Sequence, residues 1–211
     1  MVYIIMICMT VPLLLLMTML DNKSRLLLGF VLCGMVLAVC AYEINSLVCY
    51  SFQLSGPELS ITAAPVIEEI LKALPVLFFA VLVSDERKQI LQLAMAVGIG
   101  FAILENAFLL LTYVDEVDIG WAIARGISTS LSHGICTLTV GCGIIFVRKQ
   151  KKLFYTGTFA LLALAMTFHA TFNLLIQSQY DYVALALPIV IYAVFWIVRL
   201  KGRQLSVQTK I

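Results

Sequence analysis

The sequence predicts an all-α, polytopic membrane protein with about seven transmembrane helices. Of its 211 residues, 62% are hydrophobic and 12% are charged, and the mean hydropathy is +1.04. This composition excludes an ordinary soluble domain. Several apolar runs are also long enough to cross a bilayer as helices. A third observation, the placement of lysine and arginine, gives the predicted helices an orientation.

We predict seven spans, each of about 17 residues or more. The whole chain, residues 1–211, is expected to be one transmembrane domain. Its core, at residues 61–176, holds most of the polar residues inside spans, and the other spans flank this core. The predicted spans are residues 2–20, 26–52, 61–83, 90–114, 119–147, 153–176 and 182–200.

The positive residues alternate strictly between the polar breaks. The second, fourth and sixth breaks, at residues 55–60, 115–118 and 177–181, carry no lysine or arginine. By the positive-inside rule, the N-terminus is expected outside and the C-terminus in the cytoplasm of a multi-pass cell-membrane protein. We expect the lipid bilayer as its surroundings and no nucleic-acid partner. The cytoplasmic positive residues are Lys23, Arg25, Arg87, Lys88, Arg148, Lys149, Lys151, Lys152, Arg199, Lys201, Arg203 and Lys210.

The first span is expected to be a retained helix. It lacks a basic region before its apolar part, that part is long for a signal peptide, and Asp-Asn-Lys-Ser-Arg follows it in place of a cleavage site. The six cysteines all lie in apolar runs without a CxxC pair, which predicts small buried side chains and no disulfides.

Two adjacent carboxylates and a lysine interrupt the third span. A charge near the middle of a membrane helix costs about 2.5–3.5 kcal/mol, so Glu68, Glu69 and Lys72 indicate a functional site. Glu68 and Lys72 are four residues apart and face the same side, while Glu69 points about 100° away. One carboxylate can pair locally, and the other needs partners from elsewhere in the chain.

Such partners occur in the next three spans. Glu105, His133 and His169 each lie inside a predicted helix, and Asn173 shares a helix face with His169. At 1.5 Å per residue, Glu68, Glu105 and His169 lie about 10, 14 and 10 Å below the outer ends of their helices. His133 lies about 20 Å below, or nearer 10 Å if the span begins at Trp121 and Arg125. We therefore predict one polar layer in the outer half of the membrane.

Some of these residues also have a structural interpretation. A histidine or asparagine can join helices by hydrogen bonds, Arg125 can extend to the outer surface, and Glu43 with Asn45 is expected at the outer end of the second helix. The small residues Ala94, Gly98 and Ala102 recur every fourth position and predict a close approach of two helix backbones.

The charges of the layer do not balance. Three glutamates face Lys72 and Arg125, which leaves one negative charge, so one carboxyl is expected to share a proton. A carboxyl that gains and loses a proton near neutral pH can act as a general base. The sequence has no HExxH, no GxSG and no pair of aspartates within spans. Glutamate, histidine and asparagine suit the activation of water and the stabilisation of an oxyanion.

The motifs Glu68-Glu69-x-x-Lys72, Phe101-x-x-x-Glu105-Asn106, His133 and His169-x-x-x-Asn173 resemble those of the PrsW-type intramembrane proteases. These proteases are relatives of the CAAX prenyl endopeptidases and of bacteriocin-processing membrane proteases. The resemblance implies a glutamic-type endopeptidase without a cofactor, which cuts a membrane-anchored protein, such as an anti-sigma factor, near the outer leaflet.

By the same resemblance, Glu68 is the general base, Glu69 supports it, and His169 with Asn173 holds the oxyanion. Either Glu105 or His133 orients the water, because this chain has Glu105 where the CAAX endopeptidases have histidine. Lys72, Phe101, Asn106 and Arg125 are supporting residues. Two alternatives stay open: a zinc site formed by Glu68, Glu105, His133 and His169, and a proton- or ion-coupled transporter.

Overall fold

The computed structural model describes the backbone of residues 1–208 and the side chains of residues 1–198. The four positive residues of the tail therefore lie outside the described side chains. Within this part every regular element is an α-helix, and there are seven long helices and one short helix. They are α1 (Val2–Met17), α2 (Asn22–Phe52), α3 (Gly56–Ile61), α4 (Ala63–Leu82), α5 (Arg87–Thr112), α6 (Ile119–Ile144), α7 (Lys151–Ile176) and α8 (Asp181–Gln208).

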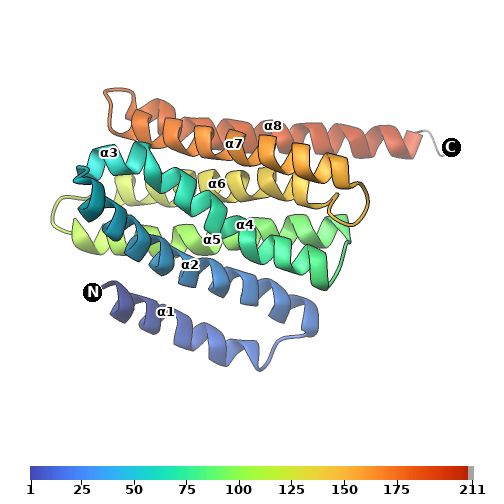
Figure 1. Ribbon diagram of the computed structural model, residues 1–211, viewed down its shortest axis with the longest axis horizontal. Coiled ribbons are helices and arrows are strands. Elements are labelled where there is room, and N and C mark those ends of the chain that lie inside the picture. Colours follow the sequence, from blue (N-terminus) through green and yellow to red (C-terminus); the bar gives the residue numbers. More distant parts are fainter. Residues whose placement is uncertain (209–211) are drawn as a thin grey trace.

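The long helices run along one common axis and alternate in direction (Figure 1). Helices α5 and α6 lie in the middle of the bundle. At one edge, α1 packs on α2 and α5, and at the opposite edge α8 packs on α6 and α7. In the described part, α2, α5, α7 and residues 181–198 of α8 are long and apolar enough to cross a membrane, and α1 is a shorter apolar helix. The count of seven spans remains a prediction.

The first loop begins three residues earlier than the sequence predicted, and hydrogen bonds hold both of its ends. Helix α1 ends at Met17, three residues before the predicted end at 20, because the Arg25 guanidinium donates hydrogen bonds to the carbonyls of Met17 and Leu20. Asp21 then caps α2 by accepting from the backbone of Lys23 and Ser24. These bonds, chiefly the bond with Ser24, lower the pKa of Asp21 below its ordinary value.

The predicted polar break at residues 55–60 forms the short helix α3. Its start is a capping box, in which Ser55 Oγ accepts from the Glu58 amide and Glu58 Oε2 accepts from the Ser55 amide at 2.9 Å. Bonds from Ser55 lower the pKa of the Glu58 carboxyl. The following helix α4 begins at Ala63, two residues after the predicted start, because α3 ends at Ile61 and a non-helical Thr62 separates the two.

Glycines bring the central helices into backbone contact. A Cβ atom on Gly34 of α2 would lie 2.1 Å from the Val97 carbonyl oxygen of α5, and one on Gly100 would lie 2.0 Å from the Val31 carbonyl oxygen. A Cβ on Gly98 would lie 2.4 Å from the His133 carbonyl oxygen of α6. The close approach predicted at Gly98 is therefore confirmed, and its partner is α6.

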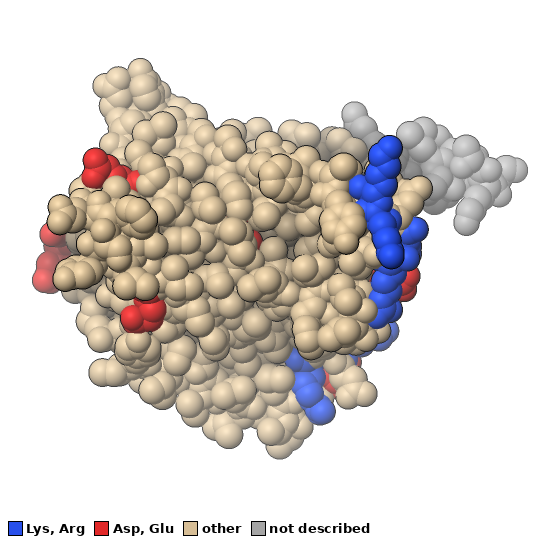
Figure 2. All heavy atoms as spheres, viewed as in Figure 1, with Lys and Arg blue, Asp and Glu red and all other residues tan. Residues whose placement is uncertain are grey.

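Two apolar clusters fill the bundle. The first joins α4, α5, α6 and α7 and includes Val76, Phe79, Val97 and Val140. The second joins α1, α2 and α5 and includes Met35, Phe101 and Leu104. On the face shown in Figure 2, lysine and arginine gather at one end of the molecule. This is the end where α2, α5 and α7 begin.

Candidate active site

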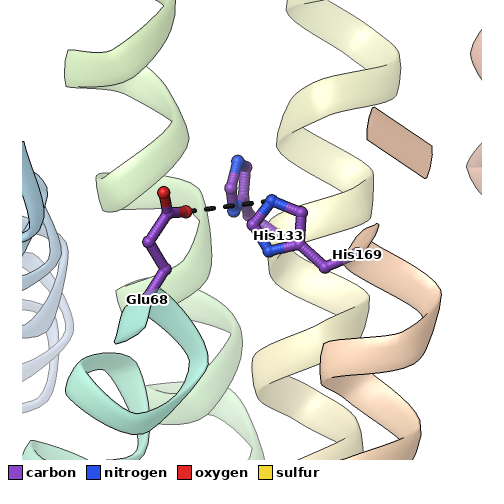
Figure 3. A group of neighbouring side chains, drawn as sticks. All are labelled: Glu68, His133 and His169. Atoms are coloured by element: carbon purple, nitrogen blue, oxygen red, sulfur yellow. Dashed lines mark ion pairs between the residues drawn. The ribbon is translucent and has the colours of Figure 1, made fainter. Parts of the chain in front are cut away.

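Four helices direct titratable side chains into one buried cluster beside the first apolar cluster. Figure 3 shows Glu68 of α4, His133 of α6 and His169 of α7 pointing toward one another. One ligand atom of each lies within 4.8 Å of the others, and the two imidazole rings meet edge to face with centroids 4.8 Å apart. The structure therefore brings these three predicted residues together from separate helices.

Lys72 lies at the centre of the cluster with its side chain fully buried. Its Nζ is 2.6 Å from Glu69 Oε1 and 2.9 Å from His133 Nδ1, and it lies 4.7 Å from the centre of the Phe101 ring. The sequence placed Glu68 on the same side as Lys72, but the structure pairs Lys72 with Glu69. Positions three and four apart are both neighbours on a helix, so spacing alone does not select the partner.

Glu68 turns toward α2 and α7. Its Oε1 accepts a hydrogen bond of 3.3 Å from Asn45 Nδ2 of α2. Its Oε2 lies 3.8 Å from His169 Nε2 and is buried without a hydrogen-bond partner among the described residues. One oxygen of the carboxylate thus accepts a hydrogen bond, and the other has no donor among the described residues.

Sequence reasoning missed the role of Asn45, which it placed at the outer end of its helix as a structural residue. The depth argument could have found it. Asn45 lies seven residues before Phe52, the last residue of α2, which corresponds to about 10 Å at 1.5 Å per residue. This is the depth predicted for Glu68.

The contacts determine which histidine nitrogen carries the proton. An ammonium only donates hydrogen bonds, so His133 Nδ1 accepts from Lys72, and His133 Nε2 carries the proton toward Glu105 Oε2 at 2.6 Å. His169 Nδ1 lies 2.9 Å from Glu69 Oε1, so this nitrogen donates to the carboxylate. The Nε2 atom of His169 is left facing Glu68.

Glu105 belongs to the same chain of contacts. Its Oε1 lies 3.6 Å from the Arg125 guanidinium, which itself lies 5.4 Å from the centre of the Trp121 ring. Only 12% of the Arg125 side chain is exposed. Arg125 therefore turns toward Glu105, and the structural interpretation in which it extends to the outer surface does not apply.

Two of the predicted residues make no hydrogen bond or ion pair with this cluster in the described part of the chain. The Asn173 amide shares the helix face of His169 but donates a hydrogen bond of 2.8 Å to the Ser60 carbonyl of α3. Gln177, directly after α7, donates a second bond to the Ser60 hydroxyl, so the C-terminal end of α7 is tied to α3. Asn106 is buried, and its Oδ1 has no hydrogen-bond partner among the described residues.

A cavity of about 110 Å³ adjoins the cluster on the side of α1, α2 and α5. Glu68, Glu105 and Asn45 supply its polar lining, and the rest is apolar or aromatic. The apolar lining consists of Val2, Ala38, Ala41, Tyr42, Phe101, Leu104 and Phe108. Both carboxylates of the cluster that face this side can therefore be reached from one cavity.

The fold and the cluster define a helical membrane protein with a buried site of glutamate, histidine and lysine. Residues 22–199 match the family described as PrsW family intramembrane metalloprotease. Because this match covers most of the chain, the protein belongs to the PrsW family of intramembrane proteases and is a hydrolase that acts on peptide bonds. The predicted family is confirmed. No curated protein and no solved structure matches the chain.

The family description names a metalloprotease, and the donor chemistry of the site fits a divalent cation. A carboxylate with two imidazoles is a donor set of catalytic zinc sites, and here Glu68, His133 and His169 supply it. Glu69 also lies behind His169 Nδ1, as a carboxylate does when it orients a ligating histidine. One contact opposes this use: while Lys72 donates to His133 Nδ1, the proton on Nε2 keeps His133 from ligating.

Proposed function

We propose that the protein is a glutamic-type intramembrane endopeptidase in which Glu68 activates the attacking water. The observation that carries the proposal is the free, buried Oε2 of Glu68, which faces His169 Nε2 at 3.8 Å beside a cavity. In the neutral tautomer that Glu69 favours, His169 Nε2 is an acceptor, as is Glu68 Oε2. Two buried acceptors that face each other need a donor, and a water molecule supplies two O–H groups.

The water held in this way is ready for general-base catalysis. Glu68 takes one proton as the water oxygen attacks the scissile carbonyl, and it later passes this proton to the leaving amine. Asn45 holds the other carboxylate oxygen, so Oε2 keeps its direction toward the water. Glu69 and Lys72 act through His169 and His133 by fixing the tautomers of both rings.

The resemblance gives His169 and Asn173 the role of binding the oxyanion, and this role requires Asn173 to change its hydrogen-bond partner. The Asn173 amide donates to the Ser60 carbonyl, so it has to leave this bond before it can donate to an oxyanion. In this proposal His169 orients the water, because its Nε2 atom faces Glu68 Oε2. Glu105 and His133 form a hydrogen bond with each other, and His133 also accepts from Lys72, so this pair positions the Lys72 ammonium.

The proposed setting is a cell membrane crossed by seven helices, with the N-terminus outside and the C-terminus in the cytoplasm. The basic end of the bundle supports this orientation (Figure 2). The cluster lies toward the opposite end, because Glu68 precedes Val76 in α4 and Glu105 follows Val97 in α5. The proposed substrate is a membrane-anchored protein, such as an anti-sigma factor, cut near the outer leaflet.

A metal-dependent protease is the second candidate, and the short distances among Glu68, His133 and His169 favour it. A zinc ion held by these residues, with Glu105 as a further donor, would act as a Lewis acid toward the scissile carbonyl. His133 could join as a ligand only after Lys72 gave up its contact or its proton. Glu69 would still orient His169 in that case.

The proposal is tested by comparing new protein N-termini in membranes from cells that express wild type or Glu68→Gln at matched levels. We expect cleavage near the outer boundary of at least one membrane protein to require Glu68, with a loss of about 100-fold or more, as for an essential general base. Glu116→Gln, at an exposed carboxylate of the α5–α6 loop, is the matched control and should cleave normally. Identical profiles with folded protein, together with a solute flux that requires Glu68, would favour the transporter.

Metal dependence is tested on the purified protein. Because Lys72 occupies His133 Nδ1, we expect less than stoichiometric zinc by mass spectrometry and cleavage that persists after treatment with 1,10-phenanthroline. One zinc ion per chain that His169→Ala removes, together with activity that chelation abolishes and zinc restores, would establish the second candidate and contradict the glutamic mechanism.

A further inference from the structure

The first turn of helix α1 forms part of the wall of the cavity that leads to the cluster. Its residue Val2 is buried and lines the cavity together with Glu68 and Glu105. The match to the protease family begins at residue 22, the first residue of α2, so α1 lies outside the matched part. A helix that precedes the family core thus lies between the reactive carboxylates and the surrounding lipid.

Among the described residues, α1 is attached by one apolar face, by one side-chain hydrogen bond near the cavity and by the bond of Arg25 to the Met17 carbonyl at its other end. The apolar face packs on α2 and α5 and contains Val2, Ile5, Met6, Met9, Leu13 and Met17. Three of these are methionines, whose flexible side chains repack readily against different partners. Near the cavity, the Tyr3 hydroxyl donates to Glu43 Oε1 of α2 at 2.5 Å.

The other helices around the cavity are held much more firmly. Helices α2 and α5 meet backbone to backbone at Gly34 and Gly100, and α5 meets α6 in the same way at Gly98. Helix α4 is fixed through the buried contacts of Lys72 with α6 and of Glu69 with α7. Parting any of these pairs would break the cluster or expose closely packed backbones, whereas moving α1 would do neither.

The loop at the other end of α1 suits a hinge. Residues 18–21 connect α1 to α2 at the end far from the cavity, where Arg25 holds the loop through the Met17 and Leu20 carbonyls. Loss of the Tyr3 bond would therefore let the cavity end of α1 move while the hinge end stays attached.

We propose that the transmembrane segment of the substrate docks on the face of α2 and α5 that α1 covers in this structure, and that α1 moves aside to admit it. This inference rests on the proposed function. The occupant is an apolar helix, because the face already accommodates one along the length of α1. The same face continues into the cavity, so a peptide bond at the outer end of a docked helix reaches Glu68 and Glu105.

The test locks α1 reversibly in the full-length protein. Tyr3→Cys and Glu43→Cys are combined in a background without the five native cysteines that are not fully buried, and a reducible bis-methanethiosulfonate joins the two thiols. The probe is the membrane protein whose cleavage requires Glu68, co-purified with the enzyme variants in the same membranes. We expect the cross-link to lower cleavage at least tenfold and dithiothreitol to restore it.

A second variant opens the contact instead of closing it. Tyr3→Phe removes only the hydroxyl, and it should raise the initial cleavage rate about two- to tenfold, the factor by which one hydrogen bond shifts an equilibrium. Tyr50→Phe is the matched control on α2, because Tyr50 is 85% exposed. A monofunctional methanethiosulfonate of similar size controls for modification of the two cysteines.

The outcomes separate the two proposals. Unchanged cleavage by the cross-linked protein overturns docking beneath α1 and leaves the protease function intact. Absence of any cleavage that requires Glu68, in wild type as well as in the variants, overturns the protease function and this inference with it. Loss on cross-linking, recovery on reduction and a faster Tyr3→Phe enzyme support both.

Discussion

The two ends of the helix bundle are held together by different forces. Toward the basic end, α4, α5, α6 and α7 share an apolar cluster whose members are almost fully buried. Toward the other end, the same four helices meet through glutamate, histidine and lysine. Apolar packing needs only shape and volume, whereas buried charges need a specific partner for each group.

This difference shows where the chemistry can reside. Among the described residues, the charged layer retains buried carboxylate oxygens without hydrogen-bond partners on Glu68 and Glu69. An unpaired buried carboxylate oxygen lowers the stability of the fold, so it is not expected in a layer that serves stability alone. Such an oxygen can still accept a hydrogen bond from water or from a substrate. The apolar end keeps the helices in register, and the charged end can therefore remain incompletely paired.

The largest effect is expected where the charged layer loses its central cation. Lys72→Met leaves Glu69 buried without its ion pair and His133 Nδ1 without its donor, which should cost about 3–5 kcal/mol of unfolding free energy. Cleavage that requires Glu68 should also disappear. Unfolding in mixed micelles measures the first effect, and N-terminus profiling measures the second.

A double variant tests the reason for that loss. Glu69→Gln combined with Lys72→Met removes both charges, and it should recover most of the stability without recovering activity. Equal destabilisation of the single and double variants would show that lost packing, not the unpaired carboxylate, causes the effect.

The backbone contact between α5 and α6 is expected to be sensitive to the size of a side chain, not to its charge. Gly98→Val places new atoms against the His133 carbonyl of α6, 2.4 Å from the position of a Cβ, and should destabilise the protein by about 1–3 kcal/mol. It should also lower activity, because His133 would shift with its backbone. Gly126→Val is the control on α6, where a Cβ meets no atom within 4 Å. Thermal melts that do not distinguish the two variants would contradict the close contact.

The smallest effect is expected at the edge of the charged layer. Asn45→Ala removes the hydrogen bond to Glu68 Oε1, and a single such bond accounts for about a tenfold loss of kcat/KM. Stability should change little, because Asn45 is only partly buried. Ser46→Ala, at the neighbouring exposed residue, should leave kcat/KM unchanged. An Asn45→Ala enzyme with wild-type kinetics would exclude Asn45 as the residue that positions Glu68.

The sequence by itself determined the helical class and singled out most of the residues that form the candidate site. An apolar run that crosses a membrane forms a helix because its backbone must satisfy its hydrogen bonds internally, and this requirement applies to each run separately. Charges inside such runs are costly wherever they occur, so Glu68, Glu69, Lys72 and Glu105 stood out without any knowledge of their neighbours.

Only the tertiary structure decided which of these groups meet. Spacing allowed Lys72 to pair with either glutamate, and the positions of His133 and His169 on α6 and α7 settled the choice of Glu69. The bond from Asn45 to Glu68, the commitment of Asn173 to Ser60 and the cover that α1 provides are likewise contacts between helices. The rotation of one helix against another sets such contacts, and the sequence of a single helix does not contain that rotation.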